Sequence, residues 1–263
     1  MRLRIKFQVL HPGQFLPLSY QYELSSWCYK LIHSGDSQFA EFLHSKGYFL
    51  NKKNFKLFTF SRLNISNFTI MDDRMKIHSH EISFVISFFV DQAAEKMLIG
   101  LFTEQSLRLG DKITQVDLKV KNVDVQQFMV SSERVVLKTT SPIVVGKPMV
   151  RENGKLSNKY LHPKDTDFEK YFLQNLTNKY LTARKHNLIK EINLDTPMAF
   201  RLLSDEPKLQ GVTIKSHTKD ETHVKGYAFE FELTAPKELI ELGMLAGFGG
   251  KNSQGFGGTR LVK

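Results

Sequence analysis

The sequence predicts an α+β protein made of two tandem ferredoxin-like domains, each with the element order β-α-β-β-α-β. Strand patterns with a period of two residues and helix patterns with a period near 3.6 alternate in this order twice along the chain. The length of 263 residues suits two compact domains, and the hydrophobic fraction of 41% is sufficient for their cores. A polar stretch without a strong period, residues 122–132, separates the two patterns, so we expect domains at residues 1–127 and 128–263.

The first domain opens on a strand, because apolar and polar residues alternate from Leu3 to Val9. Ser19 can cap the helix that follows over residues 20–32, whose apolar residues recur at helical spacing. Gly35 ends this helix. The other predicted elements are a short helix at 37–45, strands at 56–63 and 81–90, a helix capped by Asp91, and a strand at 113–121.

The second domain repeats the same order of elements. The pair Asn153-Gly154 between basic residues predicts a hairpin over residues 147–159. Thr166 and Glu169 have the spacing of a capping box, which predicts the start of a long amphipathic helix. The other predicted elements are strands at 135–145, 199–203, 211–216, 224–234 and 257–262, and a short helix at 236–244.

The charge of the chain favours a polyanionic partner. Lysine and arginine number 37 against 27 aspartates and glutamates, a formal net charge of +10, and nucleic acid is the leading partner class for such a chain. The single cysteine, Cys28, can form neither an internal disulfide nor a zinc site built from several cysteines. The sequence contains no signal peptide pattern and no apolar stretch of spanning length, so we expect a cytoplasmic protein without a membrane partner.

Residues 247–258 form a glycine-rich segment in which six of the twelve residues are glycine. A dinucleotide-binding GxGxxG motif starting at Gly247 requires glycine where Asn252 stands, and a P-loop requires serine or threonine after Lys251. Both motifs are therefore excluded. Glycines permit a close approach of the backbone, and exposed amides beside Lys251 suit an anion such as an RNA phosphate. A flexible loop before an edge strand is the alternative interpretation.

The stretch GFGGKNSQGFG at residues 247–257 resembles the C-terminal signature of the repeat-associated RNA-binding superfamily of CRISPR systems. The segments LPLSYQY at 16–22, FLHSKG at 42–47 and KLFTFS at 56–61 narrow the resemblance to the endoribonuclease that cuts CRISPR repeat transcripts into guide RNAs. This resemblance implies two ferredoxin-like domains and CRISPR repeat RNA as the partner, with effector complex subunits or a second copy of the chain as further partners.

The resemblance also implies metal-independent cleavage without a cofactor. The ribose 2′-hydroxyl attacks the adjacent phosphate and leaves a 2′,3′-cyclic phosphate and a 5′-hydroxyl, a reaction that requires a base, an acid and positive charge on the phosphorane oxygens. By motif match, the catalytic groups fall on Tyr29, His44 and Lys56. Tyr29 lies about 200° around the helix from Trp27, away from the apolar stripe. An imidazole suits proton exchange at neutral pH, whereas a tyrosine is better suited to orienting the substrate.

Further basic and polar residues are expected to contact RNA. They are Lys52, Lys53, Lys147, Arg151, Lys155, Lys159 and Lys251, together with Asn252 and Ser253 of the glycine-rich segment. Lys52 or Lys53 can supply the catalytic charge instead of Lys56, and the basic residues of the hairpin can equally be a solvated loop. His78 and His80 share one strand face but have no third ligand at diagnostic spacing, so we expect no metal site.

Two other function classes stay open on the sequence. A non-catalytic RNA-binding subunit of a CRISPR effector complex would share the fold and the glycine-rich segment. A basic ferredoxin-like module that binds a small ligand would show neither cleavage nor a steep dependence of affinity on salt. The joint presence of Tyr29, His44 and Lys56 favours the enzyme.

Overall fold

The computed structural model describes residues 1–263 except 52, 151–153, 155, 195, 215–220 and 263. Its larger sheet has the strand order β10-β11-β1-β9-β5, with β6 also paired to β9. The four strands β11-β1-β9-β5 are the fourth, first, third and second of the predicted pattern, which is the ferredoxin-like order. The bounds are β1 (Arg2–Val9), β5 (Phe58–Phe60), β6 (Asn64–Ile65), β9 (Glu81–Phe88), β10 (Ser106–Gly110) and β11 (Gln115–Val125).

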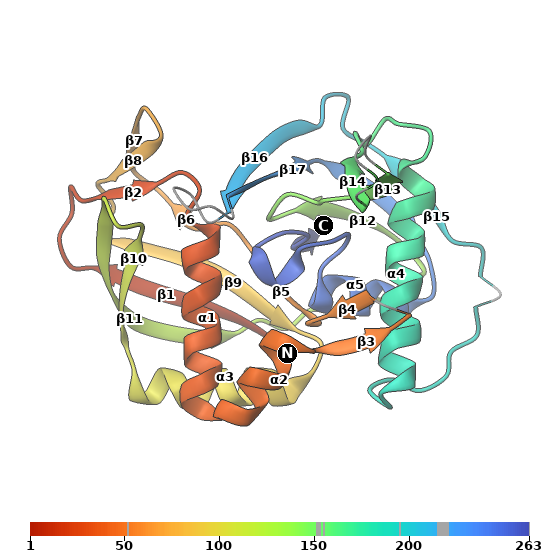
Figure 1. Ribbon diagram of the computed structural model, residues 1–263, viewed down its shortest axis with the longest axis horizontal. Coiled ribbons are helices and arrows are strands. Elements are labelled where there is room, and N and C mark those ends of the chain that lie inside the picture. Colours follow the sequence, from red (N-terminus) through yellow and green to blue (C-terminus); the bar gives the residue numbers. More distant parts are fainter. Residues whose placement is uncertain (52, 151–153, 155, 195, 215–220, 263) are drawn as a thin grey trace.

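Helices α1 (Gln21–Gly35) and α3 (Asp91–Thr103) belong to this first domain, and α2 (Ser37–Ser45) follows α1 directly (Figure 1). The alternation of β1 places its apolar side chains in the core, where Phe7 is fully buried. The Trp27 ring of α1 packs edge-on against Phe7 at a centroid distance of 5.5 Å and against Phe84 at 6.3 Å. Aromatic packing therefore holds α1 against the sheet.

The second sheet has the order β15-β18-β12-β19, again the ferredoxin-like order in reverse direction. Helix α4 carries the core residue Phe172, whose ring lies 4.9 Å from Phe200, 5.6 Å from Phe231 and 5.5 Å from Phe248. The bounds are β12 (Arg134–Thr139), α4 (Phe168–Lys185), β15 (Ala199–Leu202), β18 (Glu230–Thr234), α5 (Lys237–Ala246) and β19 (Thr259–Leu261).

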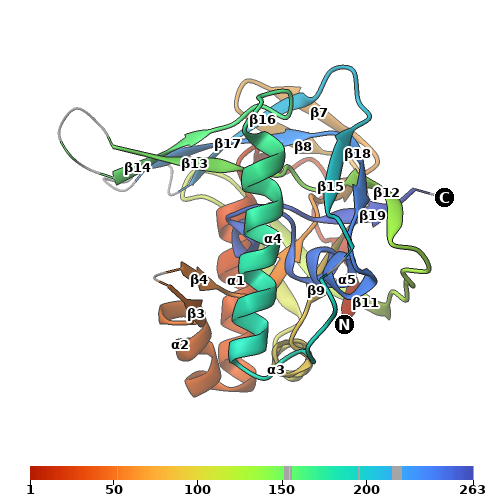
Figure 2. The same cartoon turned by 90° about the vertical axis from the view of Figure 1, so that its right-hand side faces the viewer.

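Four small antiparallel sheets lie outside the two main sheets. A three-stranded sheet has the order β2-β8-β7, and three two-stranded sheets are β3-β4, β13-β14 and β16-β17. Figure 2 shows β3 and β4 beside the lower half of α4. The bounds are β2 (Phe15–Pro17), β3 (Tyr48–Leu50), β4 (Lys53–Phe55), β7 (Phe68–Met71), β8 (Arg74–Ile77), β13 (Gly146–Val150), β14 (Leu156–Tyr160), β16 (Lys208–Ile214) and β17 (Thr222–Ala228).

The glycine-rich segment, residues 247–258, lies between the two domains at the centre of Figure 1. From the first domain, Thr59 Oγ1 donates a hydrogen bond to Phe256 O at 2.8 Å, and Ser25 Oγ donates to Ser253 O at 2.7 Å. The buried Arg2 guanidinium, also of the first domain, donates a hydrogen bond to Met244 O at 2.9 Å. Hydrogen bonds therefore join the C-terminal end of the second domain to the first domain, and the hydrophobic cores of the two domains are continuous.

The predicted fold class is confirmed, whereas three predicted caps are wrong. Asp91 is the first residue of α3, and Val90 stands at the N-cap position. Ser19 does not cap α1; its hydroxyl accepts a hydrogen bond from Thr213 N at 3.2 Å. The capping box is absent because α4 begins later, with Asp167 at its N-cap position, and the Glu169 carboxylate accepts from Phe200 N at 2.9 Å. Ser19 and Glu169 thus accept hydrogen bonds from backbone groups that are distant in the sequence, and not from the helix ends that the local sequence predicts.

The domain division after residue 127 stays a prediction. Strand β11 ends at Val125, four residues beyond the predicted end, and β12 begins at Arg134. No helix in the described part of the chain is long and apolar enough to cross a membrane.

The crossing of α1 and α3 leaves no room for side chains at two glycines. A Cβ on Gly100 would lie 2.0 Å from Leu31 O, and a Cβ on Gly35 would lie 2.1 Å from Lys96 O. We expect Gly100→Ala to lower the free energy of unfolding by about 2–3 kcal/mol, because the helices must move apart. This loss exceeds the gain of about 1 kcal/mol that alanine brings to a helix.

Urea denaturation measures this loss directly. The control is Gly211→Ala, since a Cβ at Gly211 meets nothing within 4 Å, and its effect is expected to stay within about 1 kcal/mol. Equal stability of the Gly100→Ala protein and the unaltered protein would contradict the close crossing.

Candidate active site

Tyr29 and His44, two of the predicted catalytic residues, lie side by side. Tyr29 extends from α1 and His44 from the last turn of α2, and their rings meet edge-on at a centroid distance of 5.2 Å. The Tyr29 ring also contacts the Phe58 ring of β5 at a centroid distance of 5.5 Å. Tyr29 is half-buried and the His44 side chain is exposed. The His44 imidazole therefore lies at the surface, packed against the Tyr29 ring, where a substrate can reach it.

Lys56 joins the same group. Its Nζ donates a hydrogen bond to His44 O at 2.7 Å. Gly47, with φ of 60°, turns the chain between α2 and β3, and a Cβ there would lie 3.1 Å from the Lys56 Nζ. Burial lowers the pKa of Lys56 from its ordinary value. The structure thus brings together the three residues that the sequence predicts as catalytic.

The glycine-rich segment of the second domain contributes to this group. Burial raises the pKa of Tyr29 to about 12, and a hydrogen bond with the Ser253 side chain opposes this rise. The Tyr29 phenol is therefore protonated at neutral pH and can donate a hydrogen bond, but it is a poor proton acceptor. Ser253, predicted from the sequence as an RNA contact, lies next to the predicted catalytic residues.

Asn252 has an internal role in the segment. Its Nδ2 donates to Phe248 O and Phe256 O, both at 3.0 Å, and so bridges the two sides of the turn. Residues Asn252–Gln254 form a short 3₁₀ helix, with Lys251 before it in the left-handed region at φ of 62°. Lys251 is exposed. The glycine-rich segment is therefore a hydrogen-bonded loop that leads into the edge strand β19.

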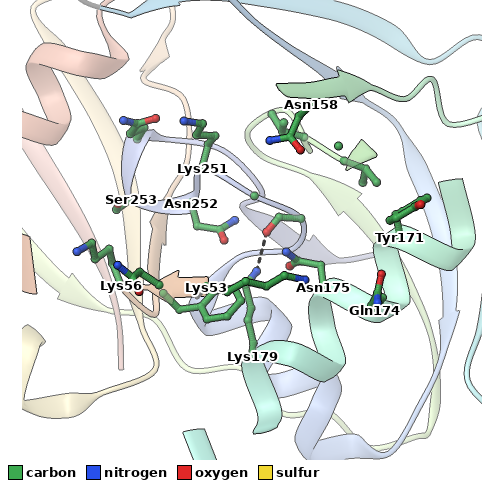
Figure 3. Close-up of a pocket in the computed structure, with 18 of the residues that line it drawn as sticks. Lys53, Lys56, Asn158, Tyr171, Gln174, Asn175, Lys179, Lys251, Asn252 and Ser253 are labelled. Atoms are coloured by element: carbon green, nitrogen blue, oxygen red, sulfur yellow. Dashed lines mark hydrogen bonds between the residues drawn. The ribbon is translucent and has the colours of Figure 1, made fainter. Parts of the chain in front are cut away.

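A cleft of about 530 Å³ lies between the domains (Figure 3). It is bordered by β4, the hairpin β13-β14, α4 and the glycine-rich segment. Four of its lining residues are lysines, namely Lys53, Lys56, Lys179 and Lys251. None of the described lining residues is acidic. Its charge therefore suits a polyanion, and Lys56 and Ser253 connect it to Tyr29 and His44.

Lys179 is a residue of this cleft that the sequence interpretation missed. Its side chain is only 1% exposed, and its Nζ donates hydrogen bonds to Gly247 O and Gly249 O. Figure 3 shows the bond to Gly249 O, at 2.8 Å, as a dashed line. Burial lowers the pKa of Lys179 to about 7. A signal was present in the sequence, because Lys179 follows Leu176 by three positions on the apolar stripe of α4.

The predicted RNA contacts on the hairpin lie apart from this group. Lys147 and Lys159 face each other across β13 and β14, and both line a second cavity of about 440 Å³. Lys147 also pairs with Asp167 at 2.6 Å. The structure therefore does not bring them together with His44. Three further predicted contacts, Lys52, Arg151 and Lys155, lie outside the described residues.

His78 and His80 lie in the connection between β8 and β9, so the prediction that they share a strand face is wrong. His78 Nε2 lies 3.1 Å from Thr69 Oγ1, within hydrogen-bond distance. In the described part of the chain, no three histidine, cysteine, aspartate or glutamate residues gather in a way that could hold a metal ion.

Two ferredoxin-like domains with a glycine-rich loop and a basic cleft between them fit the repeat-associated RNA-binding superfamily that the sequence resembles. The family model described as CRISPR associated protein Cas6, C-terminal, matches residues 120–261, and that of the Cas6 N-terminal domain matches residues 15–124. The chain belongs to the Cas6 family of CRISPR-associated endoribonucleases. The resemblance inferred from the sequence is confirmed.

Known proteins are similar over the whole chain. The CRISPR-associated endoribonuclease Cas6 1 of Methanocaldococcus jannaschii is 28% identical over 257 residues, which are 98% of this chain and 91% of that protein. A solved Cas6-related protein of Pyrococcus furiosus has a TM-score of 0.80 at 23% identity, covering 100% of this chain and 98% of that one. A protein described as an RAMP protein binding different RNA substrates has a TM-score of 0.81 at 22% identity, with 100% of both chains covered. The last two likenesses support the fold.

Proposed function

We propose that this chain is a metal-independent endoribonuclease that cleaves CRISPR repeat transcripts into guide RNAs. The observation that carries the proposal is the contact of Tyr29, His44 and Lys56 at the edge of a cleft lined by lysines. Membership in the Cas6 family supports the same activity, since a relative of similar length is named a CRISPR-associated endoribonuclease. Assembly with effector subunits and homodimer formation stay predictions.

In the proposed reaction, the 2′-oxygen of the ribose forms a bond to the adjacent phosphorus while the bond from phosphorus to the 5′-oxygen breaks. The 2′-hydroxyl loses a proton and the leaving 5′-oxygen gains one, so the products carry a 2′,3′-cyclic phosphate and a 5′-hydroxyl. His44 is the principal group for these proton transfers, because its imidazole is exposed at the site.

In the proposed reaction, Lys56 stabilises negative charge and Tyr29 orients the reacting groups. The Lys56 ammonium, bonded to the backbone of His44 at 2.7 Å, stabilises the negative charge that develops on the phosphorane oxygens. The protonated Tyr29 phenol donates a hydrogen bond that orients the scissile phosphate or the imidazole. Lys53, Lys56 and Lys251 hold the backbone of a single RNA strand along the cleft.

Incubation of the purified protein with its repeat RNA in EDTA tests the activity and the mechanism together. We expect one cut per repeat, and mass spectrometry of the fragments should show a 2′,3′-cyclic phosphate. Once the cut is mapped, an RNA with a 2′-deoxy sugar at that nucleotide should bind with unchanged affinity and resist cleavage, because the nucleophile is absent.

Each other outcome contradicts a stated part of the proposal. Cleavage only with added Mg²⁺ would contradict the metal-independent mechanism, and cleavage of the 2′-deoxy RNA would contradict the nucleophile. Tight RNA binding without any cleavage would favour the non-catalytic subunit of an effector complex.

A further inference from the structure

Lys179 is a buried lysine whose amine contacts no carboxylate among the described residues. Its side chain is 1% exposed, and its ammonium contacts two main-chain carbonyls, Gly247 O and Gly249 O. Burial lowers the pKa of Lys179, and no carboxylate among the described residues raises it. Carbonyl dipoles compensate a buried charge only in part, because a full counter-charge is what offsets the loss of hydration.

Among the described residues that line the cleft with Lys179 there are other lysines and two tyrosines but no acid. The buried face of α5, which packs against α4, is apolar over residues 239–246. Arg201 of β15 is exposed and pairs with Glu232 at 3.0 Å. The titratable groups that line the cleft beside Lys179 are Lys53 of β4, Lys56, Tyr160 of β14, Tyr171 of α4 and Lys251 of the glycine-rich segment. The exposed acid of α4, Glu169, lies at the far end of that helix from Lys179 in sequence and accepts a hydrogen bond from Phe200 N.

Lys179 also supports the loop that faces Tyr29. The two carbonyls it holds belong to the residues on either side of Phe248, whose own carbonyl accepts from Asn252. The same loop then presents Lys251 to the cleft and Ser253 to Tyr29. The charge state of one buried amine is thereby linked to the shape of the surface on which RNA would lie.

We propose that Lys179 is a positioning residue whose ammonium holds the glycine-rich loop and takes the phosphodiester of cleft-bound RNA as its counter-charge. This inference rests on the proposed function, because it requires RNA in the cleft. It adds a coupling: protonation of Lys179 strengthens RNA binding, and RNA binding strengthens protonation. By linkage the two effects are equal in free energy.

The coupling has a defined sign and range of pH. With a pKa of about 7, the Lys179 amine of the free protein is charged below pH 7 and mostly neutral at pH 8. An anion nearby favours the charged form and raises a pKa by about 1 unit or more. RNA binding at pH 8 should therefore take up a proton, and affinity should fall about fivefold or more between pH 7 and pH 9.

Calorimetric titration of the 2′-deoxy repeat RNA into the protein at pH 8, in two buffers of different ionisation enthalpy, measures the proton uptake. We expect uptake of about half a proton or more for each RNA bound. A His44→Ala protein should give the same uptake, which excludes that imidazole as the source. Lys179→Met should bind without uptake and with an affinity that no longer falls between pH 7 and pH 9. The matched control is Lys237→Met at an exposed lysine of α5, which should behave as the unaltered protein.

The outcomes separate this inference from the proposed function. Failure to bind the RNA at all would overturn both. Tight binding without proton uptake, or full uptake by Lys179→Met, would overturn the role of Lys179 and leave the endoribonuclease standing. Should Lys179→Met not fold, carbon-13 NMR of the lysine ε-methylenes in the unaltered protein decides the matter. One resonance should titrate near pH 7 and move to higher pH with RNA, and its absence overturns the proposal.

Discussion

Replacement of His44 by alanine is expected to slow repeat RNA cleavage about 10²- to 10⁴-fold, the usual contribution of a positioned acid–base group. The imidazole is exposed and makes its described ring contact with Tyr29, at 5.2 Å, rather than with the core. The variant should therefore fold normally and bind RNA with an affinity within about twofold of the unaltered protein. Single-turnover cleavage and RNA affinity, measured side by side, separate the chemical step from binding.

His33→Ala is the matched control for this experiment. His33 is an exposed histidine in the last turn of α1, and it is not among the residues around Tyr29 and Lys56. Its replacement should leave the rate unchanged, which excludes a general effect of lost imidazole. Cleavage by His44→Ala at the unaltered rate would instead assign the proton transfers to another group, and partial rescue by added imidazole would support His44.

The fold could be predicted because its long elements carry their own periodicity. All four apolar positions between Leu3 and Val9 are buried, as the alternation of β1 indicates. The short strands gave no such signal. Strand β7 is four residues long and exposed at every position, so it has no alternation of buried and exposed residues, and its pairing with β8 defines it as a strand.

The candidate site was predictable where chemistry resides in side chains. Tyr29, His44 and Lys56 stand in recognisable segments, and the structure joins them. Lys179 differs because its partners are main-chain carbonyls 68 and 70 residues further along the chain. Every residue has such a carbonyl, so the sequence does not indicate which one a buried ammonium will meet.

Substitution of Gly257 by alanine is expected to break the glycine-rich loop. Gly257 has φ of 82°, and a Cβ there would lie 2.1 Å from Phe248 O and 2.4 Å from Asn252 Nδ2. The backbone between these residues must move, and with it the bonds from Asn252 to the two carbonyls. We expect the free energy of unfolding to fall by about 2–4 kcal/mol, from overpacking together with left-handed strain.

The same substitution should lower RNA affinity at least about tenfold, because Lys251 and Ser253 lose their places beside the cleft. Gly250→Ala provides the matched control for stability. Gly250 lies in the same loop, but its φ is not in the left-handed region and its Cβ would meet only Val144 O, at 3.8 Å. Its free energy of unfolding should change by no more than about 0.5 kcal/mol. Equal losses in both variants would mean that the loop yields to any side chain, and that its ordered shape is not what presents Ser253 to Tyr29.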